Sequence, residues 1–293
     1  MMLTKIFCEV YDFLKIADFK SRMLAREERK RLGRKQKMTK VDAITILIFY
    51  NFSKRTTFKD YYEMDVLGWL KSAFDYVVSY NRFLELIGKM LQEILGFLCS
   101  KCLGKPTQVN FIDSTSYEVC NIYRASSHKV FDGFAKKGKT STGWFFGMKL
   151  HVIINMYGEI VSFYLTSGNI HDANEKVIDK LTTELTGKLV GDRGYLSTKI
   201  FKNLWSKGIK LITRIKKNMK NKLMDFEEKI LLRKRAVIES VFSKLKKSYH
   251  LEHTRHRSKD NFLGHLLATL CAYKFDSKKP SIYACPIQQI NGF

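Results

Sequence analysis

Short strand-like runs alternate with helix-like segments between residues 107 and 215, and this alternation limits the possible folds more than any other feature of the sequence. Apolar and β-branched runs predict strands over 108–112, 144–155, 159–166, 188–191 and 209–215. Helical spacing predicts helices over 174–185 and 198–207, and Gly208 marks the end of the second. Strands followed by helices predict a mixed α/β domain built around one sheet.

The segments on either side of this region are predicted to be helical. Gly104 and Pro106 mark the boundary between the helical N-terminal part and the strand-rich region. A long helix is expected over 229–247 and a last helix over 258–275. The sequence therefore predicts three parts, a helical region at 1–105, an α/β domain at 106–277 and a loose tail at 278–293.

The chain carries a large excess of positive charge. It has 52 Lys and Arg against 28 Asp and Glu, which gives a formal net charge of +24 and a pI near 9.7. This excess indicates a polyanionic partner, either nucleic acid or an anionic membrane surface. The most apolar stretch, 43–49, is too short to span a bilayer, and Glu9 and Asp12 interrupt any signal peptide. We therefore expect a cytoplasmic protein that binds nucleic acid.

The helical region has two alternative roles. A basic run at 26–40 precedes the apolar segment 43–49, and short helices with a basic strip suit a helix-turn-helix that reads DNA ends. A plain helical bundle with a solvated basic face is the alternative. Cys99 and Cys102 form one C-x-x-C without a second pair at zinc-finger spacing, which favours reduced thiols over a zinc site.

Two acidic residues follow short apolar runs, and a third lies on the predicted long helix. Asp113 ends the run Val-Asn-Phe-Ile-Asp, and Asp192 ends Lys-Leu-Val-Gly-Asp. Acids at the ends of neighbouring strands would face each other, and their repulsion favours a cation between them. Glu239, at the edge of the apolar stripe of the helix, can supply a third carboxylate. Oxygen ligands favour Mg²⁺ or Mn²⁺, and two such ions can clamp the attacking and leaving oxygens of a phosphodiester.

Basic side chains accompany these acids. Arg235 and Lys246 fall near Glu239 around the helix, where they can hold phosphate oxygens. The stretch 214–247 holds 12 Lys and Arg against four acids, which favours contact with DNA backbone over a merely solvated face. The residues expected to contact DNA are Arg235, Lys246, Arg214, Lys216, Lys217, Arg255, Arg257 and Lys149.

Several motifs are similar to those of a known family. They include Phe-Ile-Asp-Ser at 111–114, Gly-Trp-Phe-Phe-Gly-Met-Lys-Leu-His at 143–151, Gly-Asp-Arg-Gly-Tyr at 191–195 and the segments 232–239 and 252–258. On these motifs, over most of its length, the chain resembles the DDE transposases of bacterial insertion sequences, most closely the insertion sequence 982 family.

The resemblance implies a ribonuclease-H-like catalytic core in which Asp113, Asp192 and Glu239 bind the metal ions. It implies a transposase that binds the terminal inverted repeats of its element, nicks the ends and joins their 3′-hydroxyls to target DNA with Mg²⁺ or Mn²⁺. Bringing two ends together implies a homodimer or a larger assembly, acting at the bacterial nucleoid. Only 46 residues separate Asp192 from Glu239, so no large inserted domain is expected there.

The last catalytic helix is also similar to that of the insertion sequence 4 group, which carries a Tyr-Arg-Glu-Lys signature. Arg235, Glu239 and Lys246 match its last three members. The Tyr position falls on Leu232, which departs from the pattern. A leucine cannot donate a hydrogen bond to DNA, so that contact is absent or is made by another residue.

Four further residues have a functional and a structural interpretation. For His151, a hydrogen bond is favoured over metal ligation, and Asp172 offers a fourth carboxylate that could serve the metal site. Trp144 and Trp205 could stack on a flipped base, but a core position is the favoured interpretation for both.

Three other functions compete with transposition. A structure-specific nuclease on the same core would cut DNA without joining it, because hydrolysis and transesterification use the same metal site. A DNA-binding relic that no longer cuts would lack metal-dependent cleavage. A protein of the membrane surface is disfavoured, because no basic amphipathic anchor is visible in the sequence.

Overall fold

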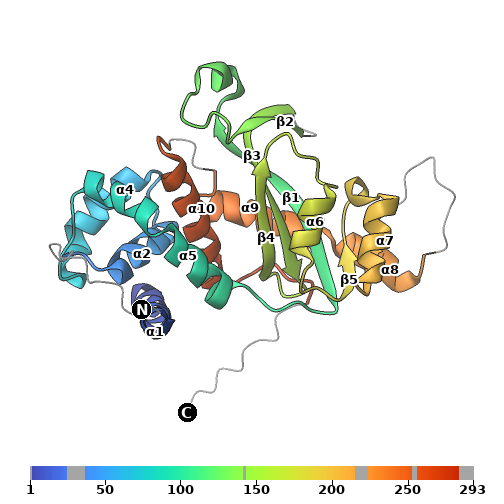
Figure 1. Ribbon diagram of the computed structural model, residues 1–293, viewed down its shortest axis with the longest axis horizontal. Helices are drawn as coiled ribbons and strands as arrows, with labels where there is room; N and C mark the ends of the chain where they lie inside the picture. Colours follow the sequence, from blue (N-terminus) through green and yellow to red (C-terminus); the bar gives the residue numbers. More distant parts are fainter. Residues whose placement is uncertain (1, 25–36, 141–142, 215–223, 253–255, 284–293) are drawn as a thin grey trace, which may run out of the picture. The chain divides into compact units, whose positions relative to one another are not determined.

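The computed structural model describes residues 2–24, 37–140, 143–214, 224–252 and 256–283 (Figure 1). The chain forms two compact units. The helical unit consists of Met1–Cys102 and Leu245–Phe275, and the sheet unit consists of Leu103–Lys244 and Asp276–Phe293. The boundary near residue 103 lies close to the predicted one, but the last helix joins the N-terminal helices instead of the α/β domain.

The helical unit is built around α10, in which 11 of the 16 residues are buried. Its elements are α1 (Met2–Leu24), α2 (Lys40–Phe49), η1 (Tyr50–Phe52), α3 (Phe58–Asp60), η2 (Tyr61–Trp69), η3 (Lys71–Ala73), α4 (Tyr80–Lys89), α5 (Leu91–Phe97), η4 (Leu98–Cys102) and α10 (Lys259–Lys274). α10 packs against α2, α4 and α5. Within this core, Thr269 Oγ1 donates a hydrogen bond of 2.9 Å to Asn51 Oδ1. This hydrogen bond offsets the cost of removing the two polar side chains from water.

Helix ends in this unit follow local sequence chemistry. Thr39 caps α2, since its side chain accepts from the Asp42 amide while the Asp42 side chain accepts from the Thr39 amide. The helical segment from Tyr80 to Phe97 is divided into α4 and α5 at Met90, whose φ of −111° departs from helical geometry. None of the described helices in either unit is long and apolar enough to cross a membrane.

The sheet unit contains one mixed six-stranded sheet. Its strands are β1 (Val109–Cys120), β2 (Lys136–Thr140), β3 (Gly143–Asn155), β4 (Ile160–Ser167), β5 (Gly187–Val190) and β6 (Ile209–Ile212). The order is β2-β3-β1-β5-β6, with β4 also paired to β3. β3 runs antiparallel to β1, β2 and β4, whereas β1, β5 and β6 are parallel to one another. The mixed α/β class is therefore confirmed.

One face of the sheet carries α6 (Glu175–Leu181) and α7 (Thr198–Ser206) (Figure 1). Ile112 of β1 belongs to the buried apolar cluster that these helices form with the strands. Because side chains alternate along a strand, Asp113 points to the opposite face. That face receives the start of α9 (Ala236–Ser248), since Asp113 contacts Arg235 immediately before it. The helix predicted over 229–247 is two segments, α8 (Phe226–Lys234) and α9, which meet at Arg235.

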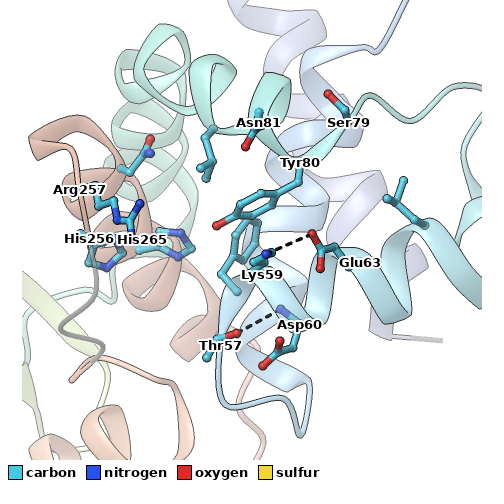
Figure 2. Close-up of a pocket in the computed structure, with 14 residues that line it drawn as sticks. Thr57, Lys59, Asp60, Glu63, Ser79, Tyr80, Asn81, His256, Arg257 and His265 are labelled. Carbon is cyan, nitrogen blue, oxygen red and sulfur yellow. Dashed lines mark hydrogen bonds and ion pairs between the residues drawn. The ribbon is translucent and has the colours of Figure 1, made fainter.

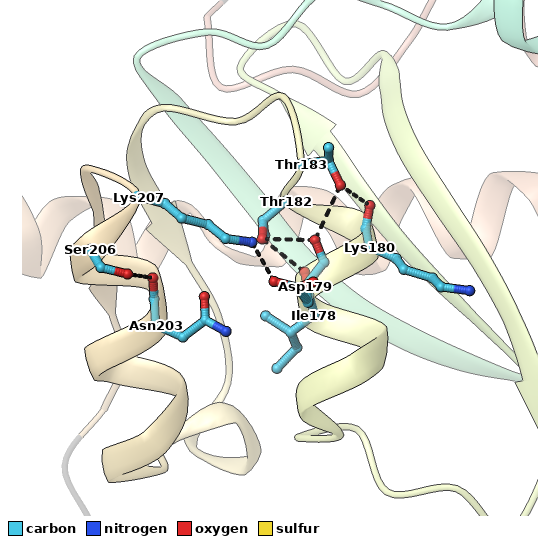
Figure 3. A network of polar contacts seen from close by, with 8 residues as sticks. All are labelled: Ile178, Asp179, Lys180, Thr182, Thr183, Asn203, Ser206 and Lys207. Atoms are coloured by element: carbon cyan, nitrogen blue, oxygen red, sulfur yellow. Dashed lines mark hydrogen bonds and ion pairs between the residues drawn. The ribbon is translucent and has the colours of Figure 1, made fainter.

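Polar contacts hold α6 and α7 together at their C-terminal ends (Figure 3). Lys207 Nζ reaches from the end of α7 to Asp179 Oδ1 at 2.5 Å. Thr182, which follows α6, is fully buried and donates to the carbonyl of Ile178 at 2.8 Å. These contacts fix the ends of two helices that cover the same face of the sheet.

The described part of the predicted tail packs onto the sheet unit. The amide of Ile282 donates to the Met156 carbonyl at 3.1 Å. Gly158, with φ of +74°, lies so close to the Pro280 carbonyl oxygen that a Cβ there would be only 1.8 Å from it. Residues 280 and 282 therefore contact the β3–β4 turn, and residues 284–293 of the predicted tail lie outside the described residues.

Candidate active site

Asp113 lies inside β1, whereas the sequence predicted that it would lie at the end of a strand. β1 continues to Cys120 because residues 113–118 stay paired with β3, for example Asp113 with Val152. The parallel partner β5 is shorter, and its last paired residue, Val190, lies opposite Phe111. Asp113 is therefore located where the parallel part of the sheet ends, which is the usual place for a site in such sheets.

Asp192 follows the end of β5 after one residue, on the strand next to β1. It lies two residues beyond Val190, as Asp113 lies two residues beyond its partner Phe111. The negative charge of Asp192 acts on the carboxyl group of Asp113. The side chain of Asp192 is exposed, so it is open to a ligand from solvent.

Arg235 connects Asp113 with Glu239. Its guanidinium lies 3.2 Å from Asp113 Oδ2 and 2.8 Å from Glu239 Oε1. The position of Arg235 at the junction of α8 and α9 directs it to β1, and Glu239 follows one helical turn later. The sequence predicts that Arg235 contacts phosphate, and the structure places its guanidinium against these two carboxylates.

Asp113 is held in an environment that opposes its negative charge. Burial raises the pKa of Asp113 to about 6, and the charges of Asp172 and Asp192 act in the same direction. The Ser114 amide, 2.8 Å from Asp113 Oδ1, and the Arg235 guanidinium lower the pKa and offset part of this rise. A bound cation would remove the remaining cost, so the site is electrostatically suited to one.

A fourth acid, Asp172, is fixed on the other face of β1. Its Oδ1 accepts from Ser114 Oγ at 2.6 Å and from Lys149 Nζ at 3.0 Å. Desolvation alone would raise the pKa of Asp172, but these two hydrogen bonds and the lysine charge lower it below its usual range. Lys149 was predicted to contact DNA. In the structure it is buried, with 9% of its surface exposed, and it forms an ion pair with Asp172.

Two residues near these acids were given no role from the sequence. Ser114, adjacent to Asp113, bonds Asp172. Tyr195 is buried, and burial together with the charges of Asp113 and Asp172 raises its pKa well above the usual value. The only signal in the sequence was their place in the motifs, since Ser114 directly follows Asp113 and Tyr195 comes three residues after Asp192. His151 is fully buried, and its Nε2 lies 2.9 Å from Thr166 Oγ1, which confirms the hydrogen-bonding interpretation.

The metal prediction is supported by donor chemistry but not by a complete ligand group. Among the residues that the structure describes, no three His, Cys, Asp or Glu side chains form a group that could hold a metal ion. Asp113, Asp192 and Glu239 nevertheless supply oxygen atoms, which hard divalent cations prefer. The positive charge between Asp113 and Glu239 comes from Arg235. Its guanidinium neutralises these two carboxylates as a bound cation would.

The other predicted DNA contacts fall in different parts of the molecule. Arg214 is exposed just after β6, and Arg257 is exposed in the helical unit. Lys246 also belongs to the helical unit and lies 2.6 Å from Glu252 Oε1. Lys216, Lys217 and Arg255 lie outside the described residues. Leu232, at the Tyr position of the signature, is 9% exposed and packs inside the sheet unit.

Arg257 lines a pocket of about 840 Å³ within the helical unit (Figure 2). Tyr80 points into the pocket opposite Arg257 and His265. Lys59 lies 3.8 Å from Glu63 on the pocket wall. The lining carries both signs of charge, so this pocket does not simply extend the basic surface predicted for DNA.

Comparison with family models decides the identity of the sheet unit. Residues 103–259 match the model described as the transposase DDE domain, which is more than half of the chain. The chain belongs to the DDE transposase family. This match confirms the family predicted from the motifs and covers Asp113, Asp192 and Glu239, while the narrower assignment to insertion sequence 982 is not resolved by it. A comparison with curated proteins finds no match.

A solved transposase structure is similar in fold. The piggyBac transposase synaptic complex with hairpin DNA aligns with a TM-score of 0.50 and 10% identity, covering 92% of this DDE transposase and 71% of that chain. This likeness and the mixed sheet confirm the ribonuclease-H-like core. The Mos1 strand transfer complex also matches, with a TM-score of 0.24 and 11% identity over 88% of this chain and 82% of that chain. The Mos1 paired-end complex with the left transposon end matches with a TM-score of 0.23 and 10% identity over 88% of this chain and 84% of that chain. Both TM-scores are too low for structural comparison.

Proposed function

We propose that this DDE transposase binds the terminal inverted repeats of its own element, cleaves at the element ends and transfers the 3′-hydroxyls to target DNA. Membership of the family establishes a transposase that acts on DNA. The specific steps rest on the arrangement of Asp113, Asp192 and Glu239. We further propose that it belongs to the insertion sequence 982 family and works as a homodimer or larger assembly on DNA in the bacterial cytoplasm, at the nucleoid.

The observation that carries this proposal is the convergence of negative charge on one half-buried carboxyl group. Asp113, with its pKa raised to about 6, receives unfavourable charge from Asp172 and Asp192 and a compensating contact from Arg235. A purely structural aspartate at this place would only destabilise the fold, whereas a cation-binding aspartate gains from the same arrangement. Asp113, Asp192 and Glu239 would hold Mg²⁺ or Mn²⁺, most simply two ions.

Each nearby side chain has a role in this scheme. When bound, the divalent ions stabilise charge on the attacking and leaving oxygens of the phosphodiester. Asp113 is kept in place by the Ser114 amide and by β3 pairing. Arg235, once its acids are neutralised by ions, is positioned to contact a phosphate oxygen through its planar donor face. Ser114, Lys149 and Asp172 support β1 from the opposite face.

The proposal is tested by a joining assay with labelled duplexes that carry the element ends, a supercoiled target plasmid and Mg²⁺ or Mn²⁺. We expect metal-dependent nicks at the element boundary and covalent attachment of the labelled strand to the plasmid. Nicks without attached product would identify a structure-specific nuclease on the same core. Specific binding of the ends with neither product would leave a DNA-binding protein.

The contacts of Arg235 favour one second candidate, a relic that binds DNA and no longer cuts it. A guanidinium that permanently neutralises Asp113 and Glu239 would leave the acids unavailable to metal. This candidate predicts that Mn²⁺ fails to bind at pH 8 even at millimolar concentration. The proposed transposase requires binding under that condition.

A further inference from the structure

Two exposed aromatic rings, one between β1 and β3 and one at the start of β3, line the same pocket. Tyr123, in η5 (Ile122–Ser127), is 90% exposed, and Trp144, at the start of β3, is 62% exposed. With Ile122 and Lys137 they line a pocket of about 590 Å³. Large exposed rings are costly in water unless a partner covers them, so their clustering indicates a binding surface. The two tryptophans predicted to lie in the core, Trp144 and Trp205, are both exposed, and that prediction was wrong.

The surface is built on a rigid base. β2 pairs with the first part of β3, which places Lys139 directly opposite Trp144 and Lys137 opposite Phe146. Lys139 Nζ lies 5.7 Å from the centroid of the Trp144 ring, a distance at which a cation and a ring attract each other. Beneath them, Phe146 is 8% exposed. The backbone that carries Lys137, Lys139 and Trp144 is therefore fixed by strand pairing before any ligand binds.

The charge around these rings fits a polyanion. Residues 121–144 include five basic side chains and one acid, Asp132. Lys136, Lys137 and Lys139 are exposed along β2. An apolar peptide or a second aromatic surface would gain nothing from this charge, whereas a nucleotide presents a flat apolar base together with an anionic phosphate. The combination of stacking rings and lysines is that of surfaces that bind single-stranded nucleic acid.

We propose that Tyr123, Lys137, Lys139 and Trp144 form a platform on which an unpaired DNA base stacks while its phosphates contact the lysines. A base within a duplex has both faces covered by its neighbours, so a ring can stack only on a base that has left the helix. The volume of about 590 Å³ lies within the range for sites of small organic groups. The proposal rests on DNA as the substrate and adds the recognition of an unpaired strand.

The platform is tested by intrinsic fluorescence in the double variant W69F/W205F, which leaves Trp144 as the sole tryptophan. Titration with a twelve-nucleotide thymidine oligomer is expected to quench Trp144 fluorescence, and the corresponding blunt duplex is expected to quench it much less. Equal quenching by duplex would overturn the preference for an unpaired base. Quenching by inorganic polyphosphate to the same extent would reduce the site to ionic contact and overturn base stacking.

Substitutions in the otherwise unaltered full chain give the second readout. Trp144→Ala is expected to weaken binding of the thymidine oligomer by about 5- to 100-fold, since stacking dominates such contacts. Trp205→Ala is the matched control, because Trp205 is equally exposed at 62% and lies on α7 against Phe201. Unchanged affinity in Trp144→Ala, or an equal loss in Trp205→Ala, would overturn the platform. Neither result depends on cleavage, so failure of the platform and failure of the transposase assignment remain distinguishable.

Discussion

At the scale of single residues, function and stability oppose each other at Asp113. Its carboxyl group is largely desolvated, and the charges of Asp172 and Asp192 act against its ionisation. One hydrogen bond from the Ser114 amide and one guanidinium provide only partial compensation. A residue in this situation lowers the free energy of unfolding of the metal-free protein, and such strain is typical of functional acids.

Asp113→Asn should therefore stabilise the metal-free protein above pH 6. The folded-state pKa of about 6 lies above the unfolded value, so ionised Asp113 costs about 2 to 3 kcal/mol at pH 8. The cost shrinks as pH falls through 6 and vanishes below about pH 4, where aspartate is protonated in both states. Thermal melts of both proteins with EDTA at pH 8 and pH 4 check this. A lower Tm for the variant at pH 8 would contradict it.

Asp172→Asn should have the opposite effect on stability. Lys149 has a side chain that is only 11% exposed, and the substitution leaves its ammonium without the carboxylate. We expect a loss of about 1 to 3 kcal/mol at pH 7 in urea titrations, less than for a fully buried pair because the Asp172 side chain is 35% exposed. The lowered pKa of Asp172 means that this contribution is lost in acid.

Asp179→Asn is the control for that measurement. Asp179 pairs with Lys207, but its side chain is 55% exposed. Surface pairs of this kind contribute little, so the shift should be clearly smaller than that of Asp172→Asn. An equal loss of stability in the two variants would show that the Lys149–Asp172 pair contributes no more than a surface ion pair.

At the scale of elements, the sequence predicted the core strands that carry Asp113 and Asp192 because each has a short apolar run. It missed the extension of β1 through Ser114 to Glu118, since polar residues there are stabilised by pairing with β3. β2 was missed for the same reason, because Lys136–Thr140 has no apolar face and its pairing with β3 is non-local. The contact of Arg235 with Asp113 was equally invisible, since 122 positions separate the two residues.

The junction of α8 and α9 predicts how Arg235 affects metal binding. Arg235→Gln removes a guanidinium that competes with a cation for Asp113 and Glu239. At pH 8, where Asp113 is ionised in the folded protein, we expect Mn²⁺ to bind about 2- to 5-fold more tightly, as removal of a partly exposed ion pair allows. Electron paramagnetic resonance of free Mn²⁺ measures the affinity. Arg233→Gln, exposed on the same helix, should leave it unchanged.

At the scale of the whole molecule, the chain forms two units that are not two sequence blocks. α10 follows the segments that carry Asp113, Asp192 and Glu239 in sequence but packs with α2, α4 and α5. Its apolar periodicity predicted that it would be buried, and periodicity alone does not specify against which helices. The net charge of +24, in contrast, is a whole-chain property and is read directly from the composition.

That charge predicts a strong dependence of DNA affinity on salt. Each phosphate neutralised releases counterions, so four lysine or arginine contacts would weaken duplex binding by about 100-fold between 50 and 200 mM salt. Fluorescence anisotropy with a labelled duplex at several salt concentrations measures the slope. An affinity that is independent of salt would mean that the basic residues do not contact the DNA backbone.

The central claim is that Asp113, Asp192 and Glu239 act together with divalent metal on DNA. The most direct measurement is cleavage of a labelled element-end duplex with Mg²⁺ or Mn²⁺ by wild type, Asp113→Asn, Asp192→Asn and Glu239→Gln, with Asp225→Asn, which lies just before α8, as control. We predict that each of the three variants binds the duplex as wild type does but cleaves it at least about 100-fold more slowly, while the control cleaves normally. Wild-type rates in any of the three variants, with the control also active, would contradict the assignment of that carboxylate to the active site.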